Sequence, residues 1–146
     1  MSTNLQAWLL CVAPAAYALL PRQTMGHLVD DFEVHHVPQA PAYANHVYLW
    51  KRKILPVFNF SALLLGERQP PKLLGIVAYR RCTEIKQGTI ALFDSPQLVD
   101  VSNEVAAWPE GSIPWPELAD SCVEIEGFGA CPIISTDKLF NFLPKN

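Results

Sequence analysis

The stretch Leu55–Leu64, LPVFNFSALL, decides the fold, because the chain carries its pattern twice. The second copy is Cys131–Phe140, CPIISTDKLF. Each copy has an apolar residue, a proline, two β-forming residues, residues that can cap a helix, and a closing pair of large apolar residues. A shorter echo, Tyr17–Leu20 (YALL) and Ile90–Phe93 (IALF), comes before each copy. Since a spaced internal repeat is typical of one supersecondary unit built twice, the pattern predicts a β-rich fold with two similar halves.

Each copy also predicts a short helix after its strand. Asn59 or Ser61 can cap a helical turn through residues 63–65, and Gly66 can end it, because glycine adopts the left-handed conformation at little cost. In the second copy Thr136 or Asp137 is expected to cap a terminal helix. The apolar residues of that helix are Leu139, Phe140, Phe142 and Leu143.

Short runs of β-forming residues, separated by Pro, Gly or charged turns, surround both copies. They predict strands at 8–12, 17–20, 46–50, 54–58, 73–79, 88–93 and 122–126. Residues 24–36 are expected to be extended, residues 67–72 have the composition of a linker, and residues 80–87 are expected to form a polar turn. Many short strands with only brief helices predict an all-β fold, either a barrel or a sandwich.

Residues 105–116 form the least regular segment. Trp108-Pro109 and Pro114-Trp115-Pro116 are predicted to lie outside helices and central strands, which do not tolerate proline in their interiors. The two tryptophans, Trp108 and Trp115, have two equally weighted roles. They anchor a protein partner, since rigid aromatic side chains dominate interface energies, or they fold back over the second half of the chain.

Composition and charge exclude several classes of partner. Half of the 146 residues are hydrophobic and 17% are charged, as in a folded protein with a sizeable core. The net charge of −3 argues against a general affinity for nucleic acid or anionic membrane, which both require a basic surface. The longest apolar run, residues 7–20, is shorter than the roughly 20 residues of a membrane-spanning helix, and no positive charge precedes it as in a signal peptide. We therefore expect a cytoplasmic protein.

The four cysteines contain no Cys-x-x-Cys pair, and each lies in or beside an apolar stretch. They are Cys11, Cys82, Cys122 and Cys131. We expect buried free thiols, with disulfides or metal binding as less favoured alternatives.

The sequence predicts neither catalysis nor a cofactor. His35 and His36 are adjacent, so on a strand they point to opposite faces and do not easily share a metal ion. No cysteine or carboxylate stands at the spacing typical of zinc ligands. Asp30, Asp31 and Glu33 are expected to form a solvated acidic segment, because nothing indicates an apolar pocket that would separate their pKa values. We expect no catalytic, cofactor-binding or metal-binding residue; a small hydrolase would need a histidine cluster that the sequence does not place.

The order of these elements resembles CheW-like domains over nearly the whole chain, from about residue 5 to residue 143. The first half of the likeness rests on residues 17–21 (YALLP), 38–43 (PQAPAY) and 54–60 (ILPVFNF), followed by Leu64 and Gly66. The second half rests on residues 75–78 (GIVA), 88–94 (GTIALFD) and 132–140 (PIISTDKLF). No single motif is specific, and the order and spacing together carry the resemblance.

This resemblance implies a single CheW-like domain over residues 1–146 that is all-β. It implies two five-stranded SH3-like barrels in pseudo-repeat with short helices, at about residues 1–68 and 72–146, with a first strand that can cross to the other half. Such proteins are non-enzymatic adaptors in bacterial two-component signalling, including systems that control type IV pili. They couple the cytoplasmic tips of methyl-accepting receptors, which dock at the groove between the barrels, to the regulatory domain of a histidine kinase, which contacts an exposed apolar edge. The alternative is a small β-barrel module that binds another protein or ligand and has lost the coupling role.

The chain departs from the family pattern at one turn. Family members usually have an Arg-Gly turn before the first proline-containing strand, where this chain has Lys51-Arg52. They also tend to carry an acidic residue that can pair with that arginine, where this chain has His27. Because Arg52 adopts a left-handed backbone less readily than glycine, a turn of different shape is expected.

Trp50, Lys51 and Arg52 are candidate protein-binding residues. They form either a docking patch for an acidic helix or a solvated hairpin turn without a partner. Nucleic acid is disfavoured, because the basic triplet at 51–53 on an acidic protein forms no extended stripe.

Overall fold

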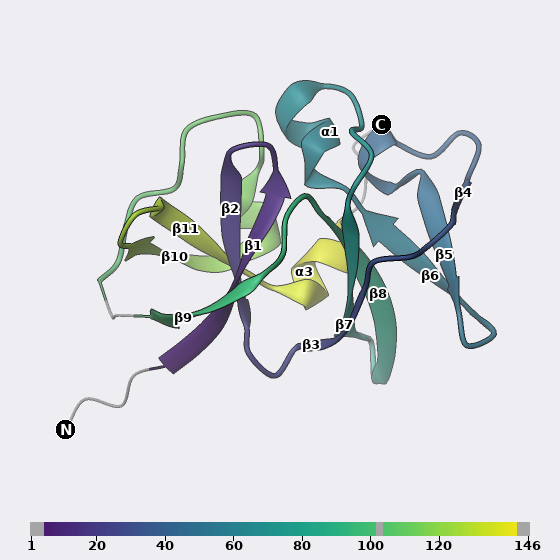
Figure 1. The fold of residues 1–146 in the computed structure, drawn as a ribbon, viewed down its shortest axis with the longest axis horizontal. Helices are drawn as coiled ribbons and strands as arrows, with labels where there is room; N and C mark the ends of the chain where they lie inside the picture. Colours follow the sequence, from purple (N-terminus) through teal and green to yellow (C-terminus); the bar gives the residue numbers. More distant parts are fainter. Residues whose placement is uncertain (1–4, 102–103, 143–146) are drawn as a thin grey trace.

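Two β-sheets make up the body of the protein, and a computed structural model describes residues 5–101 and 104–142 (Figure 1). The strands of sheet A are β1 (Leu5–Ala13), β2 (Ala16–Pro21), β9 (Gln97–Val101), β10 (Ala119–Ile125) and β11 (Gly129–Ile134). The strands of sheet B are β3 (Met25–Val29), β4 (Val34–His36), β5 (His46–Trp50), β6 (Lys53–Phe58), β7 (Leu73–Arg81) and β8 (Glu84–Leu92). The short helices are η1 (Ala42–Ala44), α1 (Phe60–Leu65), α2 (Trp115–Leu118) and α3 (Thr136–Phe140).

The repeated proline motif occupies equivalent places in the two sheets. Sheet A has the order β10-β11-β2-β1-β9 and sheet B the order β3-β7-β8-β6-β5-β4. Strand β6, from the first copy, pairs in parallel with β8, and β11, from the second copy, pairs in parallel with β2. Strand β2 contains the echo at residues 17–20, and β8 contains most of the echo at residues 90–93. The first copy of the motif therefore pairs with the echo in the second half of the chain, and the second copy pairs with the echo in the first half.

That exchange determines how the chain divides between the sheets. Sheet B is built from residues 25–92 without interruption, whereas sheet A joins β1 and β2 to the strands after residue 97. The sheets therefore do not follow the expected boundary at residues 68–72. Sheet B also has six strands, and not the five expected of each half.

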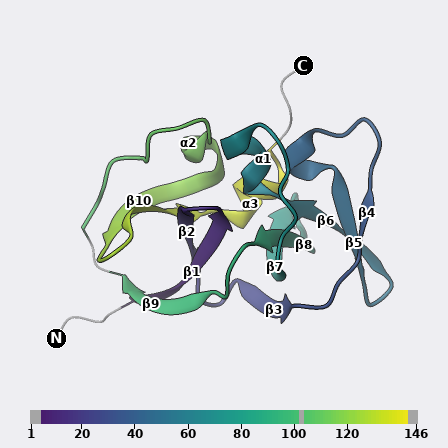
Figure 2. The same ribbon diagram turned by 45° about the horizontal axis from the view of Figure 1, so that its top comes forward.

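Apolar side chains from both sheets fill the space between them. Alternate residues of β1 and β2 point to opposite faces, so Leu10 and Leu20 enter the central core while Leu9 and Leu19 pack on the other side of sheet A. Helices α1 and α3 lie between the sheets (Figure 2), where Phe60 and Leu139 are buried in the same central core. The two sheets thus share one hydrophobic core.

The capping predictions are confirmed for the first copy and wrong in detail for the second. The Asn59 side chain accepts a hydrogen bond from the backbone N–H of Ser61, and Gly66 ends α1 in the left-handed conformation. Helix α3 is capped by Ser135, whose hydroxyl accepts from the Lys138 N–H, and not by Thr136 or Asp137. Leu143 lies outside the described residues.

Three further sequence predictions are corrected. Strands β7 and β8 continue to the tip of their hairpin, with Arg81 paired to Glu84, so the expected long turn at 80–87 is short. Trp115 and Pro116 lie in helix α2, which tolerates proline because the first N–H groups of a helix have no intrahelical acceptor. All four cysteines are free thiols, but Cys82 is exposed at that hairpin tip and not buried.

Candidate protein-binding surface

The β5–β6 hairpin closes through the two residues Lys51 and Arg52, since Trp50 pairs directly with Lys53. Both loop residues have positive φ angles, 46° and 67°. Arg52 thus adopts the left-handed conformation, although this conformation is less favourable for arginine than for glycine. A two-residue loop must match the right-handed twist of its strands, which favours positive φ at both positions whatever their side chains.

Aromatic rings gather beside this loop. The Lys51 Nζ atom lies 5.0 Å from the centre of the Trp50 ring, and the Tyr48 ring lies 6.2 Å from that ring. The His27 ring, from β3, lies 5.2 Å from Trp50. Because β7, β8 and β6 separate β3 from β5 in the sheet order, this contact shows that sheet B curls strongly.

His27 therefore packs against an aromatic ring at the place where the resemblance implies an acidic residue. Within the described ranges, salt bridges join Lys86 to Glu84 and Lys138 to Asp120, and none involves Arg52. The loop thus presents two cationic side chains whose charge no carboxylate of the described residues neutralises by direct contact. We call Trp50, Lys51 and Arg52 the basic hairpin.

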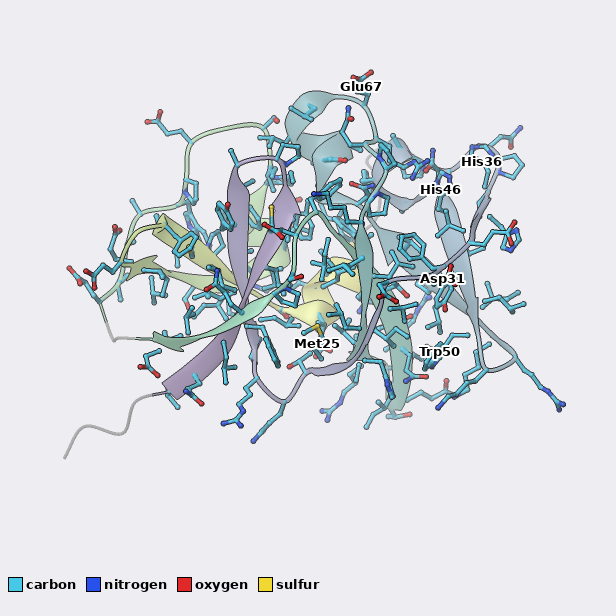
Figure 3. All side chains as sticks on the ribbon, in the orientation of Figure 1. Met25, Asp31, His36, His46, Trp50 and Glu67 are labelled. Atoms are coloured by element: carbon cyan, nitrogen blue, oxygen red, sulfur yellow. The ribbon has the colours of Figure 1, made fainter. Side chains whose placement is uncertain are left out.

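A groove of about 370 Å³ lies next to the basic hairpin, where the chain crosses from sheet A to sheet B. We call it the inter-sheet groove, and its lining residues are Trp8, Met25, Gly26, His27, Leu28 and Pro96. His27 belongs to both features, because it lines the groove and contacts Trp50. Met25 and Trp50 both lie toward the lower side of the molecule in Figure 3.

Most residues that line the groove are apolar, and a hydrogen bond fixes one of them, Trp8. Trp8, on β1, donates a hydrogen bond from its Nε1 to the carbonyl oxygen of Arg22, at 3.1 Å. This bond ties the indole to the segment that links β2 to β3. Leu28, on β3, also lines the groove and is 46% exposed. A groove with an apolar floor and a basic flank suits a partner with an apolar face and acidic residues at its edge.

The other two candidate tryptophans do not join this surface. Trp115 is only 5% exposed, and its ring stacks on Phe60 with centroids 5.4 Å apart. Trp108 is half-buried against the same central core. The loop before α2 is fastened to α1 by the Ser112 hydroxyl, which donates to the Leu63 carbonyl at 2.6 Å. Trp115 therefore packs in the central core shared by both sheets.

Most of the inter-sheet groove was not predictable as a site. Trp8 belongs to a predicted strand, and Met25 and Leu28 belong to a segment expected only to be extended. Their proximity to Pro96 depends on how two sheets pack, which no local pattern encodes. The departure at His27 was the one available signal.

Comparison with solved structures identifies the fold of the chain. No family model matches the sequence, and no curated protein matches it. Among solved structures, the scaffolding protein TtCheW from Thermoanaerobacter tengcongensis is similar, with a TM-score of 0.71 over 100% of this chain and 94% of that chain. The chain has a CheW-like fold. At 13% sequence identity, this similarity to TtCheW concerns the fold alone.

The CheW-like fold confirms the mostly β class with short helices, which the repeated proline motif predicted. It also agrees with the order of elements on which the resemblance rested. In the described part of the chain, no helix combines the length and apolar character needed to cross a membrane.

Proposed function

We propose that the chain is a non-enzymatic, cytoplasmic adaptor, a single CheW-like domain that couples chemosensory receptors to a histidine kinase. The observation that carries this proposal is the similarity to a CheW scaffolding protein over the full length of the chain. A scaffold acts through surfaces, and the proposal assigns this role to the inter-sheet groove with its basic hairpin. The proposal assigns no residue a catalytic role.

The proposed architecture is a pair of SH3-like barrels, one for each sheet. Support comes from the face of sheet B that points away from the central core, where the buried residues Val57, Leu74 and Ala91 pack with Val29 and Tyr48. Strands near both ends of the sheet order thus contribute to one small core. The contact between His27 of β3 and Trp50 of β5 likewise brings these two strands together, as the closing of a barrel requires.

The inter-sheet groove is the proposed receptor contact. Its apolar lining suits the apolar face of a helical hairpin, and Lys51 and Arg52 suit acidic residues beside that face. Electrostatic complementarity of this kind raises association rates and orients the partner. The receptor tip that fits is therefore a helix with an acidic edge.

An exposed apolar pair on sheet B is the proposed kinase contact. Leu49 and Ile54 lie directly opposite each other on β5 and β6 and are 58% and 71% exposed. Two large exposed apolar side chains that lie side by side on β5 and β6 form the start of a binding patch, whereas single scattered apolar residues on a surface do not indicate one.

Co-purification with a receptor cytoplasmic fragment and a kinase regulatory domain from the same genome tests the proposal. Leu28→Ser in the groove should reduce receptor recovery, because it removes apolar contact area. Leu65→Ser, at the end of α1, is the matched control, since Leu65 is 48% exposed, much like Leu28, but does not line the groove. Folded protein that recovers neither partner contradicts the coupling role.

One observation favours a second candidate, a binding module that no longer couples receptors to a kinase. His27 packs on Trp50, and no carboxylate of the described residues pairs with Arg52, so the charge pair implied by the family resemblance is missing. A His27→Glu variant separates the two candidates. If it gains receptor recovery that the natural chain lacks, the second candidate is correct.

A further inference from the structure

Two histidines face each other across β4 and β5, on a part of sheet B that does not line the inter-sheet groove. His36 pairs directly with His46 in the antiparallel register, and their ring centroids lie 5.5 Å apart at an interplanar angle of 74°. Figure 3 labels both at the upper right of the molecule. His35 pairs with Val47, so its side chain points to the opposite face. The strand register, and not sequence adjacency, therefore brings two imidazoles together.

We propose that His36 and His46 form a bidentate site for a divalent transition-metal ion of the Ni²⁺, Cu²⁺ or Zn²⁺ class. Imidazole nitrogen is a preferred ligand of these ions. With nitrogen–metal bonds of about 2.0–2.1 Å, two rings bound to one ion at about 90–110° have centroids about 4.5–5.2 Å apart. The observed separation is slightly larger, and His36 is exposed, so a small rotation of its side chain closes the difference.

A hydrogen bond with Asn45 orients the His46 ring. The Asn45 Oδ1 atom lies 2.6 Å from the His46 Nδ1 atom. An amide oxygen only accepts hydrogen bonds, so Nδ1 carries the proton and Nε2 keeps its lone pair. Metal-binding histidines are commonly oriented through such a bond from the nitrogen that does not bind the metal.

The charged groups near His36 and His46 affect how strongly the pair would bind an ion. Burial, followed by the nearby Arg68 and His36, lowers the pKa of His46. The Arg68 guanidinium also repels a cation, which limits the affinity. No group of three or more His, Cys, Asp or Glu that could hold a metal occurs in residues 5–101 and 104–142, so water completes the coordination. These features favour an accessible, exchangeable ion over a permanent structural one.

Chromatography of the untagged protein on nickel–nitrilotriacetate tests the chelation, because this nickel has two neighbouring free positions. We expect the natural chain and His35→Asn to be retained alike. His36→Asn and His46→Asn should elute at about tenfold lower imidazole or flow through, since each loses one of the two nitrogens. The proposal is overturned if His36→Asn is retained as strongly as the natural chain.

A titration with NiCl₂ in solution gives an independent measurement. An ion that binds only the folded state raises the Tm, so the natural chain and His35→Asn should show a rise that chelator reverses. His36→Asn should show none, and its near-UV circular dichroism without metal should match that of the natural chain. Equal Tm shifts in His36→Asn and the natural chain contradict the site.

Discussion

Arg52 holds a backbone conformation that glycine adopts at far lower cost. Its φ of 67° costs roughly 1–2 kcal/mol for an L-residue with a Cβ atom. We predict that Arg52→Gly raises the free energy of unfolding by about 1 kcal/mol, measured by urea denaturation. The same variant should weaken binding of an acidic partner, because it removes a charge from the basic hairpin.

Arg81→Gly is the matched control for that prediction. Arg81 is also exposed and lies at the end of β7 without a positive φ. The substitution should therefore destabilise the strand and not stabilise it. If Arg52→Gly and Arg81→Gly change stability in the same direction, the left-handed turn is not a source of strain.

The cysteines should differ sharply in reactivity. Burial raises the pKa of Cys11 and Cys122, and burial, followed by nearby Cys122 and Glu124, raises the pKa of Cys131 to about 11. Cys82 is exposed. We predict that iodoacetamide at pH 8 modifies Cys82 alone in the folded protein, detected by peptide mass spectrometry, because thiolate and access are both required. Rapid modification of a Cys82→Ser variant would contradict the buried placement of the other three.

At the residue scale, the sequence predicts where a turn lies along the chain better than it predicts the backbone conformation of the turn. The charged triplet between two apolar runs located the hairpin turn correctly at Lys51-Arg52. Its left-handed backbone follows from a loop of two residues, and that loop length depends on the pairing of Trp50 with Lys53 across the strands. Burial of Trp115 against Phe60 likewise depends on a partner far away in the chain.

The packing of α3 on sheet B rests on a glycine. A Cβ atom placed on Gly88 of β8 would lie 2.5–2.9 Å from ring atoms of Phe140, which also stacks on Tyr79. We predict that Gly88→Ala destabilises the protein by about 1–3 kcal/mol, measured by thermal and urea unfolding. The ring must move to admit a methyl group.

A double-mutant cycle with Phe140→Leu tests the cause of that effect. The smaller side chain leaves room for the methyl group, so Gly88→Ala should cost less in the Phe140→Leu background. Additive effects of the two substitutions would show that the loss comes from the strand itself and not from contact with α3.

Among the elements, strands with alternating or continuous apolar residues were predictable, and the two proline motifs correctly indicated a strand followed by a short helix. Strand β9 was missed. Strand β9 lies at the edge of sheet A and pairs with β1. Its short sequence, QLVDV, includes two polar residues, Gln97 and Asp100, and gives only a weak strand pattern. A short edge strand gains its order from its neighbour more than from its own sequence.

The whole molecule should unfold in one step, because both sheets contribute to the central core. Leu20 of β2 and Leu92 of β8 belong to different sheets and are both fully buried in it. We predict that Leu20→Ala and Leu92→Ala each lower stability by about 2–5 kcal/mol while keeping a single calorimetric transition. A split into two transitions in either variant would show that the sheets unfold independently.

At this scale the sequence predicted the two-part β architecture and the basic hairpin, but not the division of strands between the sheets. The repeat itself contained the missing information, since each copy pairs with the echo from the other half. The inter-sheet groove could not be predicted, because Trp8, Leu28 and Pro96 meet only after the two sheets have packed.

The placement of β1 and β2 among the last strands of the chain has a consequence for synthesis on the ribosome. Sheet B can form once residue 92 has emerged, whereas the first hairpin to leave the exit tunnel must wait for β11 to follow before its parallel neighbour exists. Until then, the first hairpin, which contains the strongly apolar residues 8–12, lacks the neighbouring strand β11. We therefore expect nascent chains arrested between residues 93 and 118 to bind general chaperones through that first hairpin, and to release them when translation ends.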